Sequence, residues 1–172
     1  MRFQLRIIDP KLKRNARSYL FQCSLAFFAL LLVLSVEGAH LARAVIIAAI
    51  GSTAFVLFVT PHSVNASPRH VIGGHIVGVI IGGIIAAVDA TSAGQSLLAN
   101  VPLLFDVEAA LAVALSIFVM AATDTEHAPA AGTALGMVAH DFTWGLVLFV
   151  TTSVIILSLV HALMRPRLRD LL

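Results

Sequence analysis

The sequence has little charge and almost no cysteine. Charged side chains make up only 12% of its 172 residues, about half of the roughly 25% found in soluble domains. This shortage argues against a water-soluble globule. The single cysteine, Cys23, excludes a disulfide within the chain and a thiolate metal site. The sequence also lacks a His-Glu-x-x-His motif and a glycine-rich phosphate loop, so zinc-protease and nucleotide chemistry have no support.

Hydrophobic residues are abundant instead. They account for 59% of the chain, and the mean hydropathy is +0.99. Each of the main apolar runs is close to the roughly 20 residues that a helix needs to cross a bilayer. The sequence therefore predicts an all-α fold, a polytopic membrane helical bundle with four to six membrane segments. The runs lie at 18–36, 41–60, 71–88, 107–122 and 142–164.

Basic residues gather at both ends of the chain. Six of the eleven precede the first apolar run, and three more follow the last one. Lysine and arginine beside apolar spans mark the cytoplasmic side of a membrane, which explains them better than nucleic-acid binding does. We therefore expect a basic cytoplasmic N-terminal segment at 1–17, a membrane domain at 18–164 and a basic cytoplasmic tail at 165–172. The expected location is a bacterial-type inner membrane.

Two cytoplasmic ends require an even number of crossings, whereas the obvious apolar runs number five. Two solutions are open: either 128–140 is a short sixth crossing, or 107–140 is a re-entrant hairpin that leaves four crossings. In both, residues 123–128 form irregular backbone at membrane depth or at its edge. Such backbone is tolerated only where protein buries it or water reaches it. We therefore expect a short or re-entrant segment around 123–140, beside a cavity or pathway.

The first segment that could carry chemistry is 60–83. Ser67, followed by a proline, is typical of a helix N-cap. The helix that follows carries Arg69, His70 and His75 in its first turns. A helix N-terminus with an arginine beside it can attract an anion. Glycines at a spacing of four form a smooth ridge for a second helix, within the chain or between chains: Gly74, Gly78 and Gly82.

The second such segment is 123–140. Asp124, Glu126 and His127 lie between apolar runs, and ionisable groups at membrane depth by default indicate function. The alternative is a plain cytoplasmic loop with solvated carboxylates. A short helix with small residues follows, in which Thr133 can donate a hydrogen bond. Its glycines are expected to pack against a neighbouring helix: Gly132 and Gly136.

These two segments resemble the signatures of one family of integral membrane proteins, the HPP family. SPRHVIGGHIVGVIIG is similar to its Pro-Arg-Asn-x-x-Gly-Gly-His signature, and TDTEHAPAAGTAL is similar to the His-Pro-Pro motif that names the family. His70 stands where asparagine is usual, and Ala128 replaces the first proline of the naming motif. The resemblance covers roughly residues 15–164. It implies four membrane-spanning helices, which favours the hairpin, and an association of plant members with nitrite transport.

We accordingly expect a transport protein for a small inorganic anion such as nitrite. Arg69 and the two helix starts would supply positive potential, while Ser67 and Thr133 would donate hydrogen bonds. His127 and His75 would line the path, and histidine, which titrates near neutral pH, could couple protons. A passive channel and a proton-coupled carrier both remain open.

Two other functions are kept as alternatives. One is a membrane scaffold or sensor subunit without transport activity, in which the polar breaks are solvated loops. The other is a cation pathway, because Asp124 and Glu126 could attract positive ions. An enzyme is not expected, since Glu126 and His127 have no evident catalytic partner. Neither is a metal or cofactor, because His70 and His75 are five residues apart and do not share a helix face. The expected partners are the small anion, the lipid bilayer and further copies of the chain, but no nucleic acid.

Overall fold

The computed structural model describes residues 10–37, 44–101, 103–140 and 142–171. Within these ranges every regular element is helical, which confirms the all-α prediction. Residues 1–9 and 172 lie outside them, so the basic segment at 1–17 and the tail at 165–172 are described only in part. The elements are α1 (Pro10–Glu37), α2 (Ala44–Val59), η1 (Val64–Ala66), α3 (Pro68–Asp89), α4 (Ser92–Asn100), α5 (Leu104–Thr123), α6 (Ala128–Val138), α7 (Trp144–Met164) and η2 (Arg165–Arg167).

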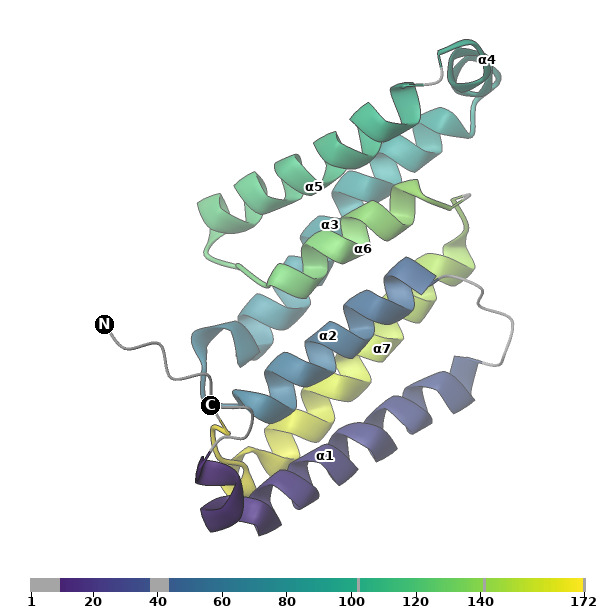
Figure 1. Cartoon of the computed structure of the whole chain (residues 1–172). Helices are drawn as coiled ribbons and strands as arrows, with labels where there is room; N and C mark the ends of the chain where they lie inside the picture. The colour runs from purple at the N-terminus through teal and green to yellow at the C-terminus, as the bar shows by residue number, and fades with distance from the viewer. Residues whose placement is uncertain (1–9, 38–43, 102, 141, 172) are drawn as a thin grey trace.

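Six of the helices run roughly side by side and alternate in direction along the chain, while the short helix α4 lies at one end of the bundle (Figure 1). The first turns of α1 and the C-terminal tail meet at the opposite end. There, the Tyr19 hydroxyl donates to the Leu171 carbonyl at 2.6 Å, and Gln22 Nε2 donates to the Arg169 carbonyl at 2.8 Å. Both described ends of the chain therefore lie at one end of the bundle, as an even number of crossings requires.

Length and composition support a membrane bundle. Among the described residues, three helical stretches are long and apolar enough to cross a membrane: Pro68–Asp89, Leu104–Thr123 and Trp144–Arg167. Two shorter apolar helices, Ala44–Val59 and Ala128–Val138, pack between longer ones. Large apolar side chains project outward from α3 and α5 as lipid-facing residues do, for example Ile80, Ile84 and Phe118.

The segment predicted around 123–140 contains the short helix α6, which returns along α3. Arg69 Nη2 donates to the Thr123 carbonyl at 3.1 Å, so α5 extends to the level at which α3 begins. The chain then turns, and α6 follows α3 in the same direction for 11 residues, about 16 Å at 1.5 Å per residue. Of the six alternating helices seen here (Figure 1), α2 and α6 have 16 and 11 residues, fewer than the roughly 20 of a full crossing.

Among the described residues, the larger apolar core joins α1, α2, α3 and α7, with Met137 from α6. Its largest fully buried side chains include Ile46, Phe58 and Phe149. The C-terminal tail closes this core at one end: Leu168 and Leu171 are buried, and the Leu171 amide donates to the Val59 carbonyl at 2.9 Å. The tail residues that the structure describes therefore pack against the bundle.

Candidate functional site

The polar break between α5 and α6 lies at the end of the bundle, against the first turns of α3. Asp124 ends α5 in the left-handed conformation (φ 54°), which turns the chain sharply. Thr125 then packs against Gly73, where an added Cβ would lie 2.8 Å from the threonine methyl group. The break therefore lies at the end of the helices, with one side packed against α3 and the other side exposed.

The outer side of the break carries an ionic cluster. Arg69 Nη2 lies 3.1 Å from Asp124 Oδ2, and these side chains are 63% and 68% exposed. His70 Nε2 lies 3.8 Å from Asp124 Oδ1 and 3.6 Å from Glu126 Oε2. We call Arg69, His70, Asp124 and Glu126 the outer layer. Arg69, Asp124 and Glu126 are more than half exposed, whereas the His70 ring is buried beneath them with 7% of its side chain exposed.

Three members of the outer layer form the group, among the described residues, that could share a metal ion. Ligand atoms of His70, Asp124 and Glu126 lie within 4.8 Å of one another. However, Asp124 is already paired with Arg69, and both carboxylates are exposed. Ion pairing explains this arrangement without a metal.

Directly inside the outer layer lies a chain of buried hydrogen bonds between α2, α3 and α6. Thr53 Oγ1 lies 2.9 Å from His75 Nε2 and 3.2 Å from His127 Nε2. His75 Nδ1 lies 2.8 Å from Thr133 Oγ1, and His127 Nδ1 lies 3.0 Å from the Asn65 carbonyl oxygen. We call Thr53, His75, His127 and Thr133 the inner layer. All four residues are at most 3% exposed.

The inner layer depends on close packing of α3 against α6. An added Cβ at Gly74 would lie 2.8 Å from His127 Cβ, and one at Gly78 would lie 2.5 Å from the Ala130 carbonyl oxygen. Gly82 meets the Ala134 backbone in the same way. The predicted glycine ridge therefore packs within the chain. On α6, by contrast, Gly132 and Gly136 face α2, against Ala49 and Ile46.

The predicted N-cap is also in place, with a different hydrogen bond. Ser67 is the N-cap of α3, and proline is the first helical residue. The Ser67 side chain, however, makes no capping hydrogen bond to the helix. Instead, Ser67 Oγ lies 2.8 Å from His70 Nδ1. Ser67 therefore orients an outer-layer imidazole and does not point toward the inner layer.

The structure thus divides the predicted site residues into two groups. His75, His127 and Thr133 meet in the buried inner layer, while Arg69, Asp124 and Glu126 are exposed and Ser67 bonds to His70. Thr53 and the Asn65 carbonyl were missed by sequence reasoning. The signal for Thr53 was present, since it is the only threonine in α2, but nothing in the sequence says which helix it faces.

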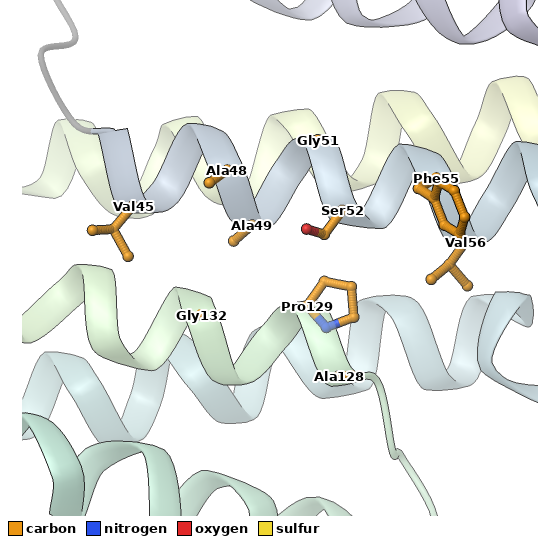
Figure 2. Close-up of a pocket in the computed structure, with 10 residues that line it drawn as sticks. All are labelled: Val45, Ala48, Ala49, Gly51, Ser52, Phe55, Val56, Ala128, Pro129 and Gly132. Atoms are coloured by element: carbon orange, nitrogen blue, oxygen red, sulfur yellow. The ribbon is translucent and has the colours of Figure 1, made fainter. Parts of the chain in front are cut away.

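A groove of about 800 Å³ runs between α2 and α6 beside the inner layer (Figure 2). Val45, Ala49 and Phe55 line it from α2, and Pro129 lines it from α6. Its lining is mainly apolar, so it offers space rather than ligands.

These features define a polytopic helical membrane protein with a buried histidine–threonine chain beside a polar break. The model of the HPP transmembrane region matches residues 11–170, nearly the whole chain, and the chain belongs to this family.

Among curated proteins, a transmembrane protein of Dictyostelium discoideum is 34% identical over 116 residues. That match covers 64% of this chain and 37% of the relative, so the chain spans well under half of the relative's length. No solved structure matches the chain. The comparisons support an integral membrane protein of this family.

Proposed function

We propose that this protein is a membrane transport protein for a small inorganic anion, and that nitrite is the first substrate to test. The observation that carries the proposal is the inner layer. Two imidazoles and two hydroxyl groups, all buried, meet where three apolar helices join. Polar and ionisable groups inside a membrane bundle are costly, and by default they mark a substrate or ion pathway.

The chemistry of the inner layer favours an anion over a cation. Imidazole N–H and hydroxyl groups are donors that bond to one another at rest and would exchange those partners for a passing anion, whereas cations such as Ca²⁺ and Mg²⁺ take oxygen ligands, mostly carboxylates and carbonyls. Within the described residues, no Asp or Glu belongs to the buried set. The helices α3 and α6 also begin at the same end of the bundle, beside this layer, and helix N-termini carry partial positive charge.

The two alternatives are weaker on the same evidence. A cation pathway would use Asp124 and Glu126, but both are exposed, and Arg69 already pairs with Asp124. A scaffold or sensor subunit would have solvated loops at both polar breaks. This description fits the outer layer, but it does not account for His127, which is fully buried.

The assembly and the location are further parts of the proposal. We expect a homodimer or larger oligomer, because one chain with so few helices encloses little volume. The open groove between α2 and α6 leaves room for close approach of another helix or of lipid. We also propose that the protein lies in a bacterial-type inner membrane, with both chain ends in the cytoplasm. Single cysteines introduced in a Cys23→Ser background, and labelled from each side of the membrane, would show on which side the chain ends lie.

The transport function is tested with purified protein in liposomes. Nitrite uptake should exceed that of protein-free liposomes, which corrects for diffusion of undissociated nitrous acid. His127→Ala should reduce this uptake, and Thr151→Val, on an exposed face of α7, should not. Reversal potentials under salt gradients give the sign of the permeating ion. Absence of flux for nitrite and for a panel of similar anions would contradict the proposal.

A further inference from the structure

The hydrogen-bond donors and acceptors of the inner layer can be assigned one by one. The Asn65 carbonyl can only accept, so His127 must donate to it from Nδ1. In its uncharged form, which burial favours, His127 then has a bare Nε2 that accepts a hydrogen bond. The group within reach is the Thr53 hydroxyl, at 3.2 Å. Thr53 therefore donates to His127 in the uncharged state.

The rest of the chain follows from that assignment. Because the Thr53 proton points at His127, Thr53 Oγ1 accepts from His75, which must carry its proton on Nε2. His75 Nδ1 is then bare and accepts from the Thr133 hydroxyl at 2.8 Å. Every donor thus points the same way, from Thr133 through His75 and Thr53 to His127 and the Asn65 carbonyl. The two histidines are opposite tautomers.

One extra proton fits into this chain with no movement of heavy atoms. When His127 gains a proton on Nε2, it becomes a donor to Thr53 Oγ1. The Thr53 hydroxyl then needs another acceptor, and the Ala49 carbonyl lies 3.0 Å away. Thr53 Oγ1 has two lone pairs, so it can accept from both imidazoles at once. All hydrogen bonds are satisfied in both states, and only the Thr53 proton rotates.

The same step is blocked at His75. A second proton on its Nδ1 would face Thr133 Oγ1, and the Thr133 proton would then need a new acceptor. In the part of the chain that the structure describes, Thr133 Oγ1 has no partner besides His75. His127 is therefore the member of the chain that can hold the proton.

We infer that the inner layer carries one proton on His127, switched by the Thr53 hydroxyl, and that this proton travels with the transported anion. This inference rests on the proposed transport function. A buried anion and a buried imidazolium offset each other's desolvation cost, whereas either charge alone would be expensive at this depth. The proton reaches His127 from the solvent side and leaves with the anion, so no net charge is stored.

Other titratable groups lie at defined places around His127. From α3 it is faced by His70, and the carboxylates of the break, Glu126 and Asp124, pair with His70 and Arg69 instead. The helices α2 and α6 contain no titratable residue. In α7 the titratable residue is His161, which is bonded to the Pro61 carbonyl away from this chain. Inside the layer, His127 has only His75 as a titratable neighbour.

The tautomers can be tested without any transport assay. The measurement is solid-state NMR of ¹⁵N-histidine-labelled protein in bilayers at about pH 8, above the ordinary histidine pKa of about 6.5. Among the seven histidines, His127 should be protonated on Nδ1 and His75 on Nε2. The variants His127→Gln and His75→Gln assign the two signals. On acidification, His127 should gain its second N–H before His75. The same tautomer for both rings, or the reverse assignment, would overturn the inference.

Coupling is tested by the initial rate of nitrite uptake with and without an inward proton gradient. One pH unit is a tenfold ratio of proton concentration, about 1.4 kcal/mol of driving force, so the wild-type rate above that of protein-free liposomes should rise with the gradient by up to about tenfold. Thr53→Val should lose this acceleration, Thr53→Ser should keep it, and Thr151→Val serves as the matched control. Nitrite flux that is equally accelerated in Thr53→Val would refute the proton chain but not transport. Absence of any wild-type flux would refute the transport function. The NMR experiment would still test the hydrogen-bond chain and its tautomers.

Discussion

The outer and inner layers lie side by side at one end of the bundle, yet they differ in charge and, apart from the buried His70, in exposure. The outer layer holds formal charges that are more than half exposed on Arg69 and Asp124 and that pair with one another. The inner layer holds no formal charge in its resting state and is almost fully buried. The formal charges of Arg69, Asp124 and Glu126 remain where water solvates them, and the uncharged polar groups of the inner layer are all hydrogen-bonded. The residues that look most reactive in a sequence are therefore not the ones that the fold places in its interior.

The largest expected effect comes from breaking the packing that encloses the inner layer. Gly78→Ala would place a Cβ 2.5 Å from the Ala130 carbonyl oxygen, so α3 and α6 must separate. Overpacking of this kind costs about 1–3 kcal/mol or more. The matched control is Gly51→Ala in α2, where nothing lies within 4 Å of the added Cβ. We expect thermal unfolding in detergent to occur at a lower temperature for Gly78→Ala only. Equal unfolding temperatures for the two variants would contradict the close packing.

A second comparison places one neighbouring residue in each layer. His127→Ala removes a fully buried side chain and its hydrogen bonds to Thr53 and to the Asn65 carbonyl, a loss of about 1–3 kcal/mol. Glu126→Ala removes an exposed carboxylate, a change that is usually worth less than about 0.5 kcal/mol. Chemical denaturation of both variants in the same detergent measures the difference. If Glu126→Ala destabilises the protein as much as His127→Ala does, the division into two layers is wrong.

The smallest effect is expected within the outer layer itself. Arg69 and Asp124 form an exposed ion pair at 3.1 Å, and such pairs contribute about 0.2–1 kcal/mol. A double-mutant cycle with Arg69→Ala and Asp124→Ala should give a coupling energy in this range. The coupling should shrink in high salt, because screening acts on exposed charges. A coupling energy that is large and insensitive to salt would mean that this pair is buried in the functional state.

Much of the local structure was predictable from the sequence. Ser67 with its following proline marks the start of α3, and the glycine spacing marks the face that packs on another helix, because both signals are local. The short segment at 123–140 was also recognised, as α6. How far α5 extends along α3 was not predictable, because the contact that shows it joins Arg69 and Thr123, which are 54 residues apart in sequence.

The site was predictable only in part, for a similar reason. His75, His127 and Thr133 were identified, but the grouping with Arg69 and the carboxylates rested on sequence proximity to the breaks. Burial separates Glu126 from His127, although they are adjacent in the chain. Thr53 joins the two histidines from a helix that lies 22 and 74 residues away in sequence. Only the three-dimensional fold supplies such a contact.

The most direct test of the account compares two histidines on the same helix, one from each layer. Initial rates of nitrite uptake into liposomes are measured for the wild type, His75→Gln and His70→Gln at equal protein density. We predict that His75→Gln lowers the rate by about tenfold or more, equivalent to at least about 1.4 kcal/mol in the barrier, and that His70→Gln has a clearly smaller effect. Unchanged uptake in His75→Gln, or a larger loss in His70→Gln, would contradict the claim that the buried chain forms the pathway.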